Sequence, residues 1–310
     1  RMRENPVKDI AIDSKTTLAD LNSQFAKAGG FVASKVATAT SIIQDMNQGE
    51  CTKFTSFPAD IMATGTRGLI RQFVERGMTD VVVTTCGTLD HDIARVLSDY
   101  YHGDFVMDDQ QLRKEGVNRL GNVLVPDESY GIPIENWLQP ILSELYDKDK
   151  RWIPWRIWHE LGLRLADEEK GSESLLATCA KKGIKVFVPG PTDGAVGSQL
   201  WMFWQTHKDF TLDILAEEHE LSDIVHEADS TGAIMIGGGI SKHHTIWWNQ
   251  FRDGLDYAVQ VTTAPEWDGS LSGARVREAV SWGKVQPKAR RITVEGDATV
   301  LLPLILGPLL

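Results

Sequence analysis

The densest group of reactive side chains in this 310-residue sequence lies between residues 266 and 284. It combines three carboxylates with Trp282 and, two positions later, Lys284. A lysine amine can attack an imine or carbonyl carbon and form a covalent Schiff base, but only in its neutral form. An adjacent indole excludes water, and the loss of water lowers the pKa of a lysine. Lys284 is therefore a candidate nucleophile, with carboxylates to hold a cationic amine; the alternative is an ordinary lysine in a surface loop.

A glycine run at residues 237–239 is followed by Lys242, His243 and His244. Glycines allow a backbone to approach a phosphate or a ring closely, and a helix that begins there favours anions. His243 is a candidate acid or base, whereas two adjacent histidines on a helix point about 100° apart and are poorly placed to share a metal. The complete GxGxxG fingerprint of dinucleotide sites is absent. A tight turn without a ligand and a structural histidine therefore stay open as alternatives.

The elements that must position these residues alternate along the chain. Near-continuous apolar runs predict strands over residues 81–85, 185–189, 232–236, 257–262 and 291–295, and helical periodicity predicts helices over 66–76, 133–146, 173–182, 212–228 and 241–253. Buried strands separated by helices favour a parallel sheet covered on both faces. Two helices are predicted before them, one that Thr17 opens and Gly29 closes, with Asp20 three positions after Thr17, and one over residues 31–48.

We therefore predict an α/β, Rossmann-like parallel sheet, with residues 1–48 as an N-terminal helical extension and residues 49–310 as a single domain. In such a sheet, ligands bind beyond the carboxyl ends of the strands. The turns after the predicted strands, at 86–88, 190–194, 237–239 and 263–270, should therefore open on one edge. Asp297 follows the last predicted strand and precedes an apolar helix, which indicates an N-cap that needs no ligand.

The composition narrows the class of protein. The sequence has 32 basic and 43 acidic residues, for a formal net charge of −11. This argues against a nucleic-acid-binding protein and permits a cationic ligand or a basic partner, although an acidic surface also serves solubility alone. The three cysteines lack zinc spacing, so we predict no metal site, and they fit a reducing cytoplasm. No secretory signal pattern is visible, and no apolar run approaches the roughly 20 residues of a membrane span.

A group of large aromatic side chains, Trp247, Trp248 and Phe251, falls on one short predicted helix beside the glycine run. Exposed in bulk solvent, such a group would be a liability for a monomer. We predict that these rings are buried, either in the core or at a subunit interface that lines the site.

Four segments of the sequence together resemble deoxyhypusine synthase. They are the run from Gly237 to Lys284, residues 82–97 (which contain VTTCGTLDHDIARVL), residues 119–130 (RLGNVLVPDESY) and residues 189–198 (PGPTDGAVGS). The EAVSWGK run at residues 278–284 is the most specific, and the resemblance extends from about residue 16 to the C-terminus. The chain resembles a prokaryotic, archaeal form, because it starts without the long N-terminal extension of eukaryotic members.

The resemblance implies an NAD-dependent transferase that works as a homotetramer, with its sites at a dimer interface. In that reaction, NAD oxidises spermidine next to its secondary amine, and an enzyme lysine attacks the resulting imine and releases 1,3-diaminopropane. The aminobutyl group then passes to one lysine of the precursor of the hypusine-containing translation factor, and the same NADH reduces the new imine. Such a site must keep NADH bound and water out between the two half-reactions.

The resemblance also implies roles for individual residues. Lys284 matches the covalent lysine and His243 the histidine of the amine channel, a candidate acid or base. The residues that match the substrate site are Glu278, Trp282, Asp268 and Tyr130. The residues that match the NAD site are Thr85, Cys86, Gly87, Asp193, Gly237, Gly238, Thr263, Ala264, Asp297 and Ala298.

Four departures from the family bear on the amine donor. Ser198 and Leu271 stand where the eukaryotic enzyme has aspartates, Trp247 stands where it has an asparagine, and His91 stands where the family has a glutamate. The two lost aspartates help to hold the amines of spermidine, and we expect other carboxylates to substitute for them: Asp127, Glu266 or Asp268.

Two other functions stay open at this point. One is a related polyamine transferase, either similar to homospermidine synthase or using agmatine as donor. The other is a catalytically weak regulatory subunit that binds NAD or a polyamine. The joint presence of Lys284, His243 and Glu278 argues against the second, because a subunit without catalysis has no need of the nucleophile.

Overall fold

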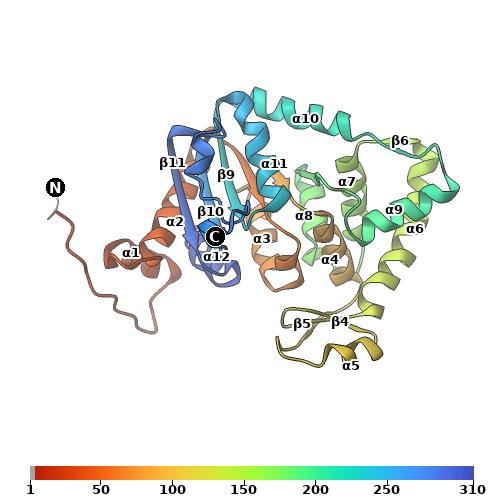
Figure 1. Cartoon of the computed structure of the whole chain (residues 1–310), viewed down its shortest axis with the longest axis horizontal. Coiled ribbons are helices and arrows are strands. Elements are labelled where there is room, and N and C mark those ends of the chain that lie inside the picture. The colour runs from red at the N-terminus through yellow and green to blue at the C-terminus, as the bar shows by residue number, and fades with distance from the viewer. Residues whose placement is uncertain (1–3) are drawn as a thin grey trace. The chain divides into compact units, whose positions relative to one another are not determined.

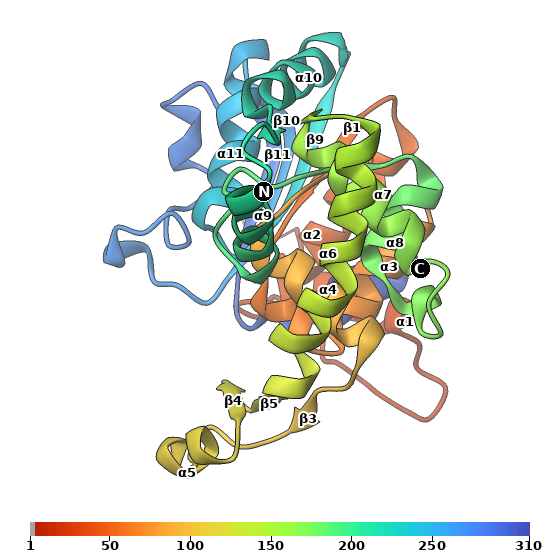
Figure 2. The same ribbon diagram turned by 90° about the vertical axis from the view of Figure 1, so that its right-hand side faces the viewer.

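The computed structural model describes residues 4–310, and the chain divides into two compact units. The first unit comprises the chain up to Phe57, residues 78–80 and residues 222–310; the second comprises residues 58–77 and 81–221. Figures 1 and 2 show the order of the elements from red at the N-terminus to blue at the C-terminus. The division into an N-terminal helical extension and a single domain stays a prediction.

The first unit is built on four parallel strands. In spatial order they are β11 (Val285–Glu295), β10 (Leu255–Thr262), β9 (Thr231–Ile236) and β1 (Thr52–Ser56). Every residue of β9 is buried, which explains its continuous apolar sequence. The helices of this unit are α1 (Leu18–Ala28), α2 (Ala33–Gln48), α11 (Gly239–Asn249) and α12 (Ala298–Leu306).

Both faces of these strands are covered. On one face, Gly232 of β9 lies so close to α2 that a Cβ atom there would be 2.7 Å from Met46 Cε. Gln260 of β10 is opposite Met235 in the register, on the other face, and its Nε2 donates to the carbonyl of Ser272, 3.1 Å away. Side chains alternate between the faces of a strand, so the segment around Ser272 and α2 lie on opposite faces of the strands.

The second unit contains the parallel pair β2 (Val81–Val83) and β7 (Lys185–Phe187) and a three-stranded antiparallel sheet. The antiparallel strands, in spatial order, are β3 (Tyr101–His102), β5 (Val123–Pro126) and β4 (Val117–Leu120), and β6 (Arg151–Trp152) pairs with β8 (Thr211–Leu212). The helices are α3 (Thr66–Glu75), α4 (Cys86–Leu97), α5 (Asp109–Lys114), α6 (Gly131–Lys148), α7 (Pro154–Leu165), α8 (Leu175–Lys182) and α9 (Ala195–Thr206). The last point at which the chain passes from the second unit to the first falls within α10 (Ile214–Glu227).

The structure confirms the α/β class and most of the predicted elements. Helix α1 has the expected caps: Thr17 and Asp20 form a capping box, and Gly29 ends the helix in the left-handed conformation. Strand β1 was not predicted, because Phe54 is its one large apolar residue. Its polar residues are buried by pairing instead, as in the 2.9 Å hydrogen bond between the hydroxyls of Thr55 and Thr79. Within residues 4–310, no helix has the length and apolar character needed to cross a bilayer.

The carboxylate of Asp92 ties α4 to α8 in the second unit. It is completely buried and accepts hydrogen bonds from Ser174 Oγ at 2.8 Å, Leu175 N at 3.0 Å and Leu176 N at 2.9 Å. Arg67 Nη1 of α3 lies 3.5 Å away and supplies the opposite charge. The carboxylate therefore satisfies the free amides at the start of α8 and joins three helices at one point.

We predict that Asp92→Ala lowers the free energy of unfolding by about 3 kcal/mol, because it strands two buried amides and the Arg67 charge. Chemical denaturation followed by circular dichroism measures the change. Asp99→Ala is the matched control, since that carboxylate is 66% exposed and pairs on the surface with Lys170. The control should change the free energy by less than about 1 kcal/mol. Equal losses in the two variants would contradict the anchoring role of Asp92.

Candidate active site

A long crossover connects β10 to β11 and contains most of the predicted chemistry. The two strands are parallel, so residues 263–284 must return from the carboxyl end of β10 to the amino end of β11. They do so with two short 3-10 helices, η5 (Glu266–Asp268) and η6 (Glu278–Val280), and no α-helix. The segment packs against α11, where the buried Lys242 Nζ donates to the carbonyls of Leu271 at 2.7 Å and Ala274 at 2.6 Å. Helix α11 therefore positions the crossover.

Lys284 is the last residue before β11, and its carbonyl accepts a hydrogen bond from Leu255 N, 3.0 Å away. Only 8% of the residue is exposed. Its Nζ lies 4.9 Å from the ring centroid of Trp282 and 5.6 Å from that of Trp247. Across residues 4–310 this Nζ has no hydrogen bond or ion pair with a carboxylate. The alternative of an exposed lysine is therefore wrong: the amine is buried between two indoles.

His243 lies one helical turn before Trp247 on α11, and the two rings stack with centroids 5.6 Å apart at an interplanar angle of 28°. Burial lowers the pKa of His243, and the positive charges of Lys284 and His244 lower it further. A lowered pKa leaves the imidazole neutral at neutral pH, so that it can accept a proton. Trp247, further along α11, is 42% exposed, and Phe251, in the 3-10 turn η4 (Gln250–Arg252) after α11, is 50% exposed, so burial of these two rings in the core of the chain is wrong. Trp248, the third ring of the prediction, is half-buried. The burial of these rings at a subunit interface stays a prediction.

The carboxylates of the crossover differ in their availability. The carboxylate of Glu266 pairs with Arg277. That of Asp268 accepts from the backbone and side chain of Ser270, which lowers its pKa. Glu278 is exposed and makes no hydrogen bond or ion pair through its side chain within the part of the chain that the structure describes. Its charge partly offsets the effect of burial on Lys242, whose pKa burial lowers to about 8. Glu278 is thus the carboxylate free to hold an amine.

The glycine turn lies at the carboxyl end of β9. Gly237 and Gly239 have φ values of 70° and 62°, and a Cβ on Gly238 would lie 2.3 Å from Ser272 Cα. Glycine is therefore required, because the crossover packs directly on the turn. The N-cap of α11 is Gly238, which has no side chain to cap the first turn, and a Cβ on Gly239 would meet no atom within 4 Å. The free amides and the open space at Gly239 suit a phosphate group.

The neighbouring strands of the first unit end at the same edge. Gly237 N donates to Val261 O at 2.7 Å, and Gly296 N donates to Thr262 O at 2.9 Å. The predicted residues at this edge are Gly237, Gly238, Thr263, Ala264, Asp297 and Ala298. Asp297 caps α12, as predicted, by accepting from the backbone and hydroxyl of Thr299. The backbone of Lys284 lies at the other end of these strands, because the crossover returns the chain to the start of β11.

The remaining predicted residues belong to the second unit. Thr85, Cys86 and Gly87 begin α4 directly after β2, and burial raises the pKa of Cys86 to about 12, which makes it a neutral thiol. The buried Asp90, one turn further, accepts from Tyr130 Oη, Ala195 N and Val196 N, each 2.8 Å away. Burial raises the pKa of this carboxyl above its usual value. Asp193 is exposed and immediately precedes Gly194, the N-cap of α9.

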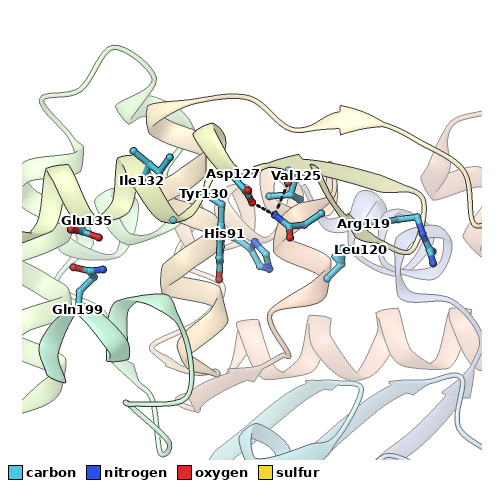
Figure 3. Close-up of a pocket in the computed structure, with 11 residues that line it drawn as sticks. His91, Arg119, Leu120, Val125, Asp127, Tyr130, Ile132, Glu135 and Gln199 are labelled. Carbon is cyan, nitrogen blue, oxygen red and sulfur yellow. Dashed lines mark hydrogen bonds between the residues drawn. The ribbon is translucent and has the colours of Figure 1, made fainter. Parts of the chain in front are cut away.

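A pocket of about 700 Å³ opens beside Tyr130 in the second unit (Figure 3). It is lined by His91, Asn118, Arg119, Leu120, Val125, Asp127, Tyr130, Gly131, Ile132, Glu135 and Gln199. His91 Nδ1 lies 2.8 Å from Tyr100 Oη, and burial lowers the pKa of His91 to about 4, so the ring is neutral. The carboxylate of Asp127 accepts from Asn118 Nδ2 at 2.8 Å (Figure 3).

The lining of this pocket includes two carboxylates, Asp127 and Glu135. Its one arginine, Arg119, is paired with Asp109 through two hydrogen bonds. The charge of the lining therefore favours cations. Glu135 and Gln199 were not predicted as site residues, since each lies within a helix whose pattern indicates packing alone. Lys242 was also missed; its place between the glycine run and His243 was the one available signal.

The fold and the lysine site define the class: a parallel-sheet α/β protein with a buried, indole-covered lysine at its candidate active site. The sequence profile of the deoxyhypusine synthase family matches residues 20–308. A relative from Thermoplasma acidophilum, named "Probable deoxyhypusine synthase", is 57% identical over 305 residues, covering 98% of this chain and 97% of the relative. One of the same name from Ignicoccus hospitalis is 48% identical, covering 97% and 94%.

A solved structure from Entamoeba histolytica, assigned to deoxyhypusine synthase, matches with a TM-score of 0.72 over 97% of this chain and 96% of that chain. At 21% sequence identity, this likeness shows the fold alone. The profile and the curated relatives show the family: the chain belongs to the deoxyhypusine synthases, which are transferases.

The lowered pKa of Lys242 has a consequence for stability. Its pKa is about 8 in the folded chain and near 10.5 in the unfolded chain, so between these values the unfolded state binds more protons. We predict that the free energy of unfolding of the wild type, relative to Lys242→Met, is flat below pH 8 and rises by up to about 3 kcal/mol toward pH 10.5.

Urea denaturation at several pH values measures this difference. Lys288→Met, at an exposed position of β11, is the matched control and should show no such rise. A difference that stays flat, or that falls with pH, would contradict the assigned state of Lys242.

Proposed function

We propose that this protein catalyses the NAD-dependent transfer of the aminobutyl group of spermidine to a specific lysine of the hypusine-containing translation factor precursor. The observation that supports this most is Lys284, an amine that is buried between Trp282 and Trp247 without a carboxylate partner, in a chain of the deoxyhypusine synthase family. The covalent step needs a primary amine at a site from which water is kept away, and the burial of Lys284 beside two indoles supplies such a site.

NAD, when bound, accepts a hydride from the donor and returns it at the end of the reaction. The open glycine turn and the uncapped start of α11 fit a dinucleotide phosphate. In the first unit we assign to NAD the residues Gly237, Gly238, Thr263, Ala264, Asp297 and Ala298. In the second unit we assign to it Thr85, Cys86, Gly87 and Asp193. Asp297 would serve from its capping position on α12.

Lys284 acts on the oxidised donor. Its Nζ attacks the imine carbon, the bond from that carbon to the nitrogen of 1,3-diaminopropane breaks, and the aminobutyl group stays on Lys284 as an imine. His243, neutral because of its lowered pKa, takes the proton that Nζ releases and can pass it to the leaving amine. Glu278 holds the cationic end of the substrate, and Trp282 shields the reacting atoms from water. The acceptor lysine then attacks the same carbon and frees Lys284.

The proposed function also needs residues that bind the substrate and an assembly of subunits. We assign Asp268, Asp127 and Tyr130 to substrate binding; the last two line the acidic pocket of the second unit. We also propose that the protein acts as a homotetramer in the cytoplasm, with the exposed rings of Trp247 and Phe251 at a subunit interface.

We predict that Lys284→Arg abolishes transfer to the precursor while oxidation of spermidine survives in part. Arginine keeps the positive charge, but it stays protonated and cannot form the imine. The assay uses NAD, spermidine labelled in its aminobutyl part and the precursor, followed by borohydride trapping and peptide mapping. Lys288→Arg, which changes an exposed lysine four positions away, is the control and should behave as the wild type.

Label on another lysine, or normal transfer by Lys284→Arg, would overturn this mechanism. Label that collects in a free polyamine instead of the precursor would identify a polyamine transferase. A wild type that labels nothing would favour the regulatory subunit.

NAD itself should raise the melting temperature, because a ligand of the folded state stabilises it by about 2.7 kcal/mol at one hundred times its dissociation constant. Thermal scans with and without NAD measure the shift, and nicotinamide alone serves as the control. Identical melting curves at millimolar NAD would argue against the cofactor.

A further inference from the structure

Trp247 is the second indole over Lys284, and no step of the proposed reaction is yet assigned to it. Its ring centroid lies 5.6 Å from Lys284 Nζ, and Trp282 covers the same amine at 4.9 Å. The two indoles are 42% and 65% exposed, whereas Lys284 is 8% exposed. Two partly exposed rings thus lie over a buried amine.

Trp247 is also held in place more firmly than a lone surface ring. On one side it stacks on His243, and on the other the ring of Phe251 meets it edge-on, with centroids 6.1 Å apart and an interplanar angle of 86°. These three rings follow one another at intervals of four residues along α11 and the turn that ends it, so they form a single row. The indole is therefore fixed against both Lys284 and the candidate base.

The proposed function places an imine on Lys284, and the rings of Trp247 and Trp282 lie over the nitrogen that carries it. If water reaches the imine carbon, it adds there, the bond from that carbon to Nζ breaks, and the products are the free lysine amine and 4-aminobutanal. No change in oxidation level is involved, so the imine survives this reaction only where water is kept away from its carbon. A neutral His243 beside the site could activate such a water molecule, which makes its exclusion more important.

We infer that Trp247 is a positioning residue that covers the Lys284 imine and directs it to the acceptor amine instead of to water. The inference rests on the proposed function. By the resemblance, the eukaryotic enzyme has an asparagine at this position. An asparagine side chain is too small to cover the imine as an indole does, so this cover is a feature of the present chain.

The test compares Trp247→Leu, Trp247→Phe and the wild type, with Trp201→Leu as the matched control, since Trp201 is a 60% exposed indole on α9 of the second unit. Each protein receives NAD, spermidine labelled in its aminobutyl part and the precursor. The readout is the ratio of label released as 4-aminobutanal, including the 1-pyrroline that it forms by loss of water, to label on the precursor. NADH absorbance gives a second readout, because each hydrolysed imine leaves one NADH that is not oxidised again.

We expect the ratio to rise at least about tenfold in Trp247→Leu, which corresponds to about 1.4 kcal/mol in the competing barriers. Trp247→Phe, which keeps an aromatic face, should give an intermediate ratio, and Trp201→Leu should match the wild type. A loss of folding or of overall rate alone would lower both products together and leave the ratio unchanged, so the ratio separates cover from general stability.

The outcomes separate this inference from the function on which it rests. If borohydride traps no label on Lys284 of the wild type, the proposed function fails, and the inference fails with it. If the wild type is labelled on Lys284 but Trp247→Leu and Trp247→Phe keep the wild-type ratio, the inference is overturned and the function stands. A folded Trp247→Leu that traps no imine would also overturn it, since Trp247 would then act in forming the imine.

Discussion

Two hydrogen bonds from one buried amine hold the candidate active site together. Lys242 Nζ reaches the carbonyls of Leu271 and Ala274, and these bonds fasten a crossover that lacks an α-helix to α11. The backbone hydrogen bonds within this crossover are those of short turns, such as Glu278 N to Arg275 O at 2.9 Å, so its course between the turns depends on what it packs against. That course delivers Glu278, Trp282 and Lys284 to the row of rings on α11. The chemistry of the site therefore depends on a residue that has no chemical step of its own.

The sequence could predict those parts of the fold that depend on residues close together along the chain. The capping box of Thr17 and Asp20 and the cap at Asp297 are set by neighbouring residues, and both are present. Strand β9 could be predicted because all of its residues are buried, which leaves a continuous apolar run. Strand β1 could not, because Thr55 is buried by a hydrogen bond to a distant residue, a fact that local pattern does not contain.

In the candidate site, too, local contacts could be predicted from the sequence and long-range contacts could not. The Schiff-base chemistry of Lys284 could be predicted from the residue type. The nearness of Trp282 could be predicted because Trp282 lies two residues before Lys284. The contact with Trp247 could not, because it joins a helix to the end of a crossover. The roles of Lys242 and Asp90 were missed for a related reason: each acts through backbone groups of distant segments, and backbone groups leave no trace in the sequence.

The position of Lys284 at the start of β11 also sets when the site can exist during folding. The first unit closes only when β11 pairs with β10 and α2 packs on both strands. The hydroxyl of Thr40 in α2 donates to the carbonyl of Ile305, 265 residues later. Such long-range closure is a late event, because the entropy of a long loop must be lost before its contacts form. Until then, Lys284 lacks the two indoles that lie over its amine in the folded chain. A partly synthesised or partly folded chain therefore carries the lysine but not the site around it.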